Sequence, residues 1–177
     1  MANFQDSTTY KKDDDYYTPK NEWEKVAHLV PKERIIWECC MLNAHNSNSM
    51  KNWEELGYKV VGNTSWDFLD CDVPECDMII TNPPFSTEIK CKILKRLLEI
   101  DKPFIIVLNV MSIYSNYWRD IFGDKIKDCQ TIIPCGKIHY EKNGVCNKKT
   151  SFYSCFVAYK MDIPNEQLFL QKMKKNK

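Results

Sequence analysis

The chain has 177 residues, of which 44% are hydrophobic and 28% charged, and its 25 basic and 24 acidic residues leave a net charge of +1. These values are typical of a globular domain, and no apolar run approaches the length of a membrane-spanning helix, so we expect no membrane partner. The near-neutral charge also excludes a global positive field for nucleic acid, which would need a local basic patch.

Nine cysteines raise the question of disulfides or a metal site. Their number is odd, no Cys-x-x-Cys pair occurs, and several lie within apolar runs such as "SCFVAY". With no signal peptide in view, we expect a reducing cytoplasmic or nuclear location, with the cysteines as small buried hydrophobic residues. A structural metal at Cys129, Cys135, His139 and Cys146 is an alternative, but it lacks a recognised spacing, and we predict no metal.

The first half of the chain predicts short alternating elements. Residues 1–15 are polar and are predicted to form a flexible arm. A helix is expected over 21–30, with Asn21 as its cap, and a second over 50–58, ended by Gly57. Strands are expected over 33–38 and 59–64, with a loop over 39–49.

The second half continues the alternation. A buried strand over 77–80 leads into Asn-Pro-Pro-Phe at 82–85, and an apolar stripe predicts a helix over 86–100 with Ser86 or Thr87 as its cap. Further expectations are a strand over 103–110, a helix over 112–122, a strand over 130–134, and two strands around a hairpin within 136–159. Residues 164–177 read as a basic tail, at most a short helix.

Strands that alternate with helices predict a Rossmann-like α/β fold, a doubly wound and mainly parallel sheet with an antiparallel C-terminal hairpin. We expect one domain over 16–163, because the sequence has neither internal repeats nor a linker.

The Asn-Pro-Pro-Phe turn is the strongest functional signal. In open parallel sheets, ligands bind beyond the carboxyl ends of the strands, and Asn82 follows such an end. Pro83 and Pro84 fix the backbone and remove its donors. The Asn82 amide oxygen and the Pro83 carbonyl would then accept the two N–H hydrogens of a planar amine, while the Phe85 ring stacks on its face. Such bonds strengthen as positive charge develops on the nitrogen.

"NPPF" after a buried strand resembles the catalytic motif of S-adenosylmethionine-dependent amino-group methyltransferases that act on adenine in DNA or RNA. The resemblance covers roughly residues 16–160 and follows the order of the family's gamma-type members. It is similar to the small phage-type and giant-virus-type enzymes, consistent with a virus-encoded origin, and implies the class I methyltransferase fold with Asn82, Pro83, Pro84 and Phe85 as catalytic residues.

The resemblance also implies a cofactor site for S-adenosylmethionine. "YYTP" resembles the element before the first strand, with Tyr17, Thr18 and Pro19, and "IIWE" resembles that strand, whose acid Glu38 would orient the methionine part. "WDFLD" resembles the pair that contacts the cofactor's adenine, Asp67 at the amino group and Phe68 against the ring. The remaining predicted cofactor residues come from the loop after the first strand and the end of the second: Cys39, Cys40, Ala44, Asn63 and Thr64.

Two features depart from the family pattern. The family carries Glu-x-x-x-Gly-x-Gly after the first strand, and here Leu42 and Ala44 occupy the two glycine positions. Asn63 or Thr64 replaces the second-strand acid that binds the ribose hydroxyls. These departures motivate an alternative in which the chain is a cofactor-poor relative serving as a nucleic-acid-binding or scaffolding subunit.

Lys137 and His139 are candidate substrate-binding residues, because they lie where a base or its phosphates could be contacted. The expected partner is a DNA or RNA substrate, with a homo- or heterodimer also open. A second enzymatic alternative is methylation of a protein glutamine, whose amide also presents two N–H hydrogens. Those enzymes generally have Tyr where Phe85 stands, which favours adenine.

Overall fold

The computed structural model of the protein describes residues 16–41, 48–63, 66–142, 145–147, 150–163 and 167–169. Within these ranges the α-helices are α1 (Lys20–Ala27), α2 (Asn48–Glu55), α3 (Thr87–Ile100) and α4 (Asn116–Phe122). Two 3₁₀ helices, η1 (Val110–Tyr114) and η2 (Gly123–Asp128), flank α4. The strands are β1 (Ile35–Trp37), β2 (Lys59–Val61), β3 (Met78–Thr81), β4 (Phe104–Asn109), β5 (Cys129–Ile133), β6 (Tyr140–Lys142), β7 (Val145–Asn147), β8 (Ser154–Tyr159) and β9 (Gln167–Phe169).

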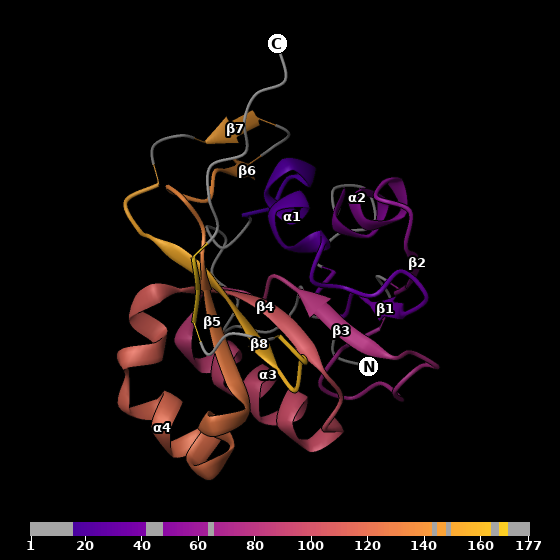
Figure 1. Cartoon of the computed structure of the whole chain (residues 1–177). Helices are drawn as coiled ribbons and strands as arrows, with labels where there is room; N and C mark the ends of the chain where they lie inside the picture. The colour runs from indigo at the N-terminus through magenta and orange to yellow at the C-terminus, as the bar shows by residue number, and fades with distance from the viewer. Residues whose placement is uncertain are drawn as a thin grey trace.

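The described strands form one main sheet and one small ribbon. The main sheet has the order β2-β1-β3-β4-β8-β5-β9, and β8 alone runs antiparallel, between β4 and β5. β6 and β7 pair antiparallel with each other, away from the main sheet (Figure 1). This arrangement confirms the predicted Rossmann-like, mainly parallel α/β fold with an antiparallel hairpin.

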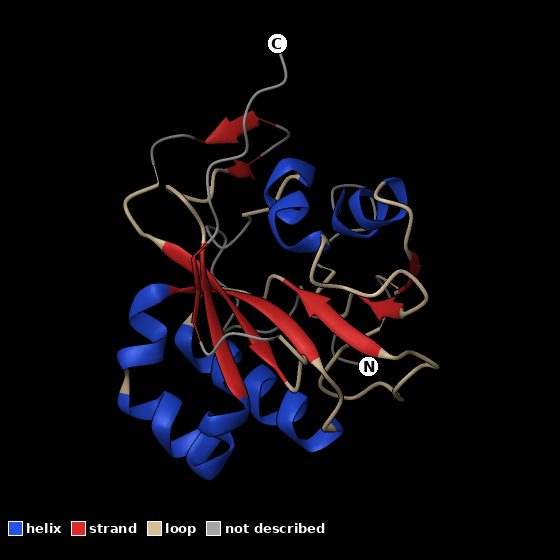
Figure 2. Ribbon diagram, in the orientation of Figure 1, coloured by secondary structure: helices blue, strands red, loops and turns tan. Residues whose placement is uncertain are grey.

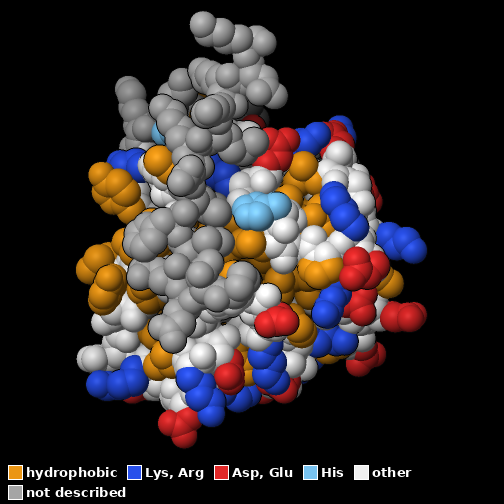
Figure 3. Space-filling view, viewed as in Figure 1, with side chains coloured by type: hydrophobic (Ala, Val, Ile, Leu, Met, Phe, Trp, Pro, Cys, Tyr) orange, Lys and Arg blue, Asp and Glu red, His pale blue; other side chains and the backbone are white. Residues whose placement is uncertain are grey.

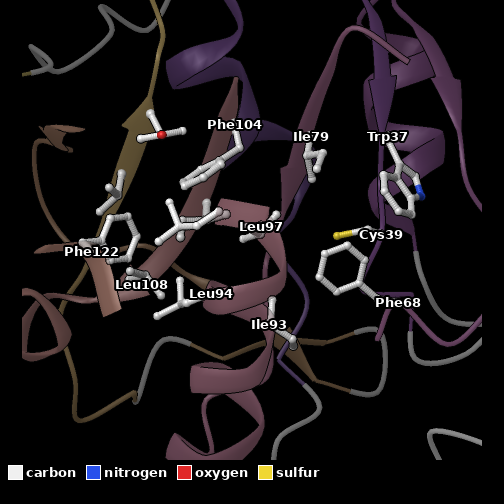
Figure 4. Packing of buried hydrophobic residues seen from close by; sticks show 14 of the residues in the cluster. Trp37, Cys39, Phe68, Ile79, Ile93, Leu94, Leu97, Phe104, Leu108 and Phe122 are labelled. Atoms are coloured by element: carbon white, nitrogen blue, oxygen red, sulfur yellow. The ribbon is translucent and has the colours of Figure 1, made fainter. Parts of the chain in front are cut away.

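The sheet is covered by helices on both faces (Figure 2). Successive residues of β3, β4 and β8 alternate between two buried clusters, as the two-residue period of a strand requires. One cluster joins Ile79, Ile106 and Val157 to the apolar side of α3 and to α4 (Figure 4). The other joins Ile80 and Phe156 to α1 and α2. In such a sheet, ligands bind at the edge formed by the carboxyl ends of the parallel strands, so this edge is the expected location of the site.

Some local predictions were wrong. Pro19, not Asn21, is the N-cap of α1, because a proline fixes the extended backbone that starts the helix at Lys20. The segment 136–159 does not form one long hairpin, since β8 leaves the ribbon to pair with β4 and β5. Gln167–Phe169 is a strand beside β5, not a helix, because an open sheet edge offers pairing that local sequence does not reveal.

Candidate active site

The chain reverses its direction of winding at β1. From β1 it passes to β2 on one side, then returns to β3 on the other, so β1 and β3 flank the topological switch point. In doubly wound sheets, ligands bind in the crevice beyond the carboxyl ends of the strands at this point. Glu38 follows β1 and Asn82 follows β3. Topology therefore places the predicted cofactor acid and the predicted catalytic amide on either side of the same crevice.

The Asn82 side chain is held in one orientation. Its Nδ2 donates to the Tyr16 carbonyl oxygen at 2.7 Å. Because a carbonyl can only accept, the nitrogen end of the amide must face Tyr16, and the oxygen end points the other way. Asn82 Oδ1 is buried and receives no hydrogen bond from any described residue. A buried acceptor without a donor is costly and rare, and here it lies at the ligand-binding edge of the sheet.

Pro83 and Pro84 are buried, and Phe85 is half-buried within a group of aromatic rings. The Phe85 ring centroid lies 5.0 Å from that of Phe152 and 5.5 Å from that of Tyr140, and Tyr16 meets it edge-on at 5.9 Å. These rings come from four separate parts of the chain and fix the Phe85 ring while leaving part of its surface exposed. The sequence did not reveal Tyr16 or Phe152 as neighbours of the motif, because these contacts are far apart along the chain.

Lys90 is a further residue next to this turn that the sequence patterns did not predict. It is buried in the first turns of α3, and its Nζ donates to the Phe85 carbonyl oxygen at 3.3 Å. Its ammonium also lies 5.5 Å from the centre of the Tyr117 ring. The helical spacing contains a signal for it, since position 90 lies on the same face as Leu94 and Leu97. The bond closes the Asn-Pro-Pro-Phe turn against the helix that follows it.

Glu38 is buried at the end of β1, where its two carboxyl oxygens are both occupied. Thr81 Oγ1 donates to Oε1, as does the Cys40 backbone N–H at 3.2 Å, and Ser49 Oγ donates to Oε2 at 2.5 Å. Burial raises the pKa of Glu38 from its ordinary 4.5 to about 7, against the lowering effect of these hydrogen bonds. Glu38 thus connects β1, β3 and α2 at the switch point.

The loop after β1 is pressed against Gly62. A Cβ at Gly62 would lie 2.8 Å from the Glu38 carbonyl oxygen and 2.8 Å from Met41 Sδ, so no larger residue fits without movement. Cys39 is buried in the core, and burial raises the pKa of its thiol well above its ordinary value. Cys40 is half-buried, with its sulfur 3.7 Å from that of Cys39. The start of this loop is therefore ordered by close packing without the family's glycines.

The segment before α1 packs over the same edge. Tyr17 pairs with Glu141 of β6 through two backbone hydrogen bonds of 2.9 and 2.8 Å, and the Thr18 carbonyl oxygen accepts from Asn52 at 3.3 Å. Thr18 Oγ1 is buried and makes no hydrogen bond to the described residues. Pro19 is buried as the N-cap of α1. Thr18 Oγ1 is thus a second buried polar atom without a hydrogen-bond partner among the described residues, and it belongs to the predicted cofactor site.

The remaining predicted cofactor residues differ in how exposed they are. Phe68 is 1% exposed, and its ring packs 5.3 Å from that of Trp37, so it presents no face for stacking here (Figure 4). Asp67 is half-buried and accepts from the Leu69 N–H at 3.0 Å. Asn63 is exposed at the end of β2. Ala44 and Thr64, with Leu42, lie outside the described residues.

The two predicted substrate residues, Lys137 and His139, lie in the segment that leads into Tyr140. Lys137 donates from Nζ to the Thr150 carbonyl oxygen at 2.9 Å, and its ammonium lies 4.5 Å from the centre of the Tyr153 ring. His139 is half-buried, and its Nδ1 has no hydrogen-bond partner in the part of the chain that the structure describes. Both precede Tyr140, which contacts Phe85.

The described residues contain neither a metal-binding cluster nor a membrane-spanning helix. No three or more His, Cys, Asp and Glu side chains gather there as a metal site would require. Among the described helices, none has the length and apolar character needed to cross a bilayer.

Comparison with protein families and with curated protein sequences gives no match. Among solved structures, the fold is similar to the crystal structure of a dimethyladenosine transferase from Plasmodium falciparum, with a TM-score of 0.49 and 10% sequence identity. The alignment covers 81% of this chain and 62% of that one, less than two thirds of its length. We therefore infer function from the residues and topology of this chain.

Proposed function

We propose that this protein transfers a methyl group from S-adenosylmethionine to the exocyclic amino nitrogen of adenine in DNA or RNA. The observation that supports it best is the Asn82 side chain at the switch point. Its amide oxygen is a buried acceptor that lacks a donor among the described residues, while the Tyr16 carbonyl fixes its direction. An exocyclic amine is a ligand that could supply the missing N–H.

The chain's own residues would bind and polarise the amine. Asn82 Oδ1 and the Pro83 carbonyl would each accept one N–H, and the Phe85 ring, held by its aromatic neighbours, would support the base. An aromatic amine is a weak nucleophile because its lone pair is delocalised into the ring. Two accepted hydrogen bonds localise electron density on nitrogen and strengthen as it becomes positively charged. The sulfonium of S-adenosylmethionine, when bound, supplies the electrophilic methyl group.

The residues at the crevice fit such a cofactor in part. Thr18 Oγ1 is an open polar atom, and Glu38 with the loop that it orders would face the methionine part. Asp67 is half-buried, and we propose that it contacts the adenine amino group, whereas the buried Phe68 ring favours a role in the core. We propose that Tyr17, Thr18, Pro19, Glu38, Cys39, Cys40, Asn63 and Asp67 line the cofactor site.

Asn82→Ala tests this proposal. We expect unchanged folding, by circular dichroism and thermal melting, and a loss of methyl transfer of about 100-fold or more, because the developing charge loses an acceptor. The assay measures transfer of a labelled methyl group to adenine-containing DNA and RNA. Gln130→Ala is a matched control, since Gln130 also donates from its amide to a backbone carbonyl, that of Ile163 at 2.8 Å, but near the amino end of β5.

The alternatives give different results. Transfer to a glutamine-containing protein but not to nucleic acid would identify a glutamine methyltransferase. Absence of binding heat with S-adenosylmethionine at millimolar concentration would identify a scaffolding subunit. Full turnover by Asn82→Ala would remove the Asn-Pro-Pro-Phe turn from the mechanism.

A further inference from the structure

Two tyrosine rings are exposed in segments that adjoin the carboxyl end of β4. Tyr114, at the end of η1, is 75% exposed, and Tyr153, just before β8, is 61% exposed. In the space-filling view, hydrophobic side chains gather at the left edge, over the segments that lead into β8 and α4 (Figures 1 and 3). Exposed aromatic rings that gather on one side of the molecule are candidates for an interaction surface.

The chain fixes Tyr153 close to the catalytic turn. Tyr153 directly follows Phe152, whose ring centroid lies 5.0 Å from that of Phe85. The Tyr153 carbonyl oxygen accepts from the Val110 N–H at 2.9 Å, which ties it to the carboxyl end of β4. Tyr114 lies four residues beyond Val110, or about 8 Å along a 3₁₀ helix. The two tyrosines therefore lie in segments that adjoin the carboxyl end of β4, the edge of the sheet at which Asn82 follows β3.

A positive charge accompanies the Tyr153 ring. The Lys137 ammonium lies 4.5 Å from the ring centre, and its bond to the Thr150 carbonyl oxygen holds it there. An exposed ring that can stack a base, combined with a cation that can contact a phosphate, is the combination used to bind unpaired nucleic acid. A protein that binds a continuous duplex instead needs an extended row of basic side chains. The chain's net charge of +1 does not indicate such a row.

We propose that Tyr153, with the Lys137 ammonium over its ring, stacks a base next to the target adenine, with Tyr114 extending the platform. The substrate of this surface is an unpaired strand, single-stranded or looped, and not a continuous duplex. This inference rests on the proposed methyl transfer and names the form of nucleic acid that the same site accepts.

Fluorescence anisotropy with a labelled adenine-containing oligonucleotide, single-stranded or annealed to its complement, tests the proposal. The wild-type protein should bind the single strand more tightly than the duplex. Tyr153→Ala should weaken single-strand binding about tenfold, and Tyr153→Phe, which keeps the ring, should restore it. Ile126→Ala, which removes an exposed side chain from η2 before the amino end of β5, is the control and should bind as the wild type does.

Several results would overturn the proposal. These are equal or tighter binding of the duplex, unchanged single-strand binding by Tyr153→Ala, or a change of oligomeric state in that variant, which would assign the rings to a protein contact. Methyl transfer measured on the same samples separates the two claims. If the wild type transfers methyl groups but Tyr153→Ala binds the single strand as tightly as the wild type, only the stacking proposal is contradicted. If binding depends on the Tyr153 ring but the wild type transfers no methyl group, the proposed reaction is contradicted.

Discussion

Asn82 and Glu38 follow neighbouring strands at the switch point, and their side-chain oxygens differ in hydrogen bonding. Each oxygen of Glu38 accepts at least one hydrogen bond from within the chain, whereas Asn82 Oδ1 accepts none from the described residues. A satisfied buried group orders its surroundings, and an unsatisfied one is available to a ligand. This difference supports the proposal that Asn82 contacts the substrate, while Glu38 connects the elements around it.

Glu38→Gln should change how stability depends on pH. Between pH 4.5 and about 7, the folded protein holds a proton on Glu38 that the unfolded chain has released. The Glu38 contribution to stability is therefore complete at low pH, falls as the pH rises through this window, and stays low above it. The full change is about 3 kcal/mol, and glutamine removes it.

Urea unfolding at pH 5 and pH 8 measures this effect. The stability of the variant relative to the wild type should rise between the two pH values, while Glu55→Gln, which alters an exposed carboxylate, should show no such rise. Parallel stability profiles for Glu38→Gln and the wild type would show that the carboxyl is ionised normally.

At the scale of elements, the loop after β1 depends on the absence of a side chain at Gly62 in the residues following β2. Met41 Sδ could move away from an added Cβ at little cost, but the Glu38 carbonyl oxygen can move only if the backbone of the loop shifts. The close approach of the residues after β2 to this loop therefore requires a residue without a side chain at position 62.

Gly62→Ala should displace this loop. We expect a stability loss of about 1–3 kcal/mol, from thermal melting, and weaker S-adenosylmethionine binding by calorimetry. Lys59→Ala, on the exposed side of β2, should change neither. A Gly62→Ala protein with wild-type melting and affinity would show that the loop does not need this contact.

Sequence patterns predicted the elements better than their partners. The apolar stripe of α3 and the apolar runs of β3 and β4 identify these elements, because helix and strand periods are local properties. The strand β9 and the aromatic neighbours of Phe85 depend on contacts between residues that are far apart along the chain. The sequence predicts that Asn82 and Glu38 lie at the same edge of the sheet, because each follows a parallel strand. Their hydrogen bonds to Tyr16 and Ser49 could not be predicted in this way.

At the scale of the whole molecule, the strand order decides where chemistry can occur. The described part of the segment before α1, the Asn-Pro-Pro-Phe turn and the residues before β8 contact one another near the switch between β1 and β3. S-adenosylmethionine bound there should stabilise the folded protein by mass action. At 100 times its Kd, we expect about 2.7 kcal/mol, seen as a melting temperature raised by roughly 5–10 °C. An unchanged melting temperature at millimolar cofactor would favour the scaffolding alternative.

The most direct test is mass spectrometry of nucleosides from adenine-containing DNA and RNA incubated with the wild-type protein and S-adenosylmethionine carrying a labelled methyl group. The account predicts labelled N6-methyladenine with the wild type and essentially none with Asn82→Ala. Label at another atom or base, or equal label with both proteins, would contradict it.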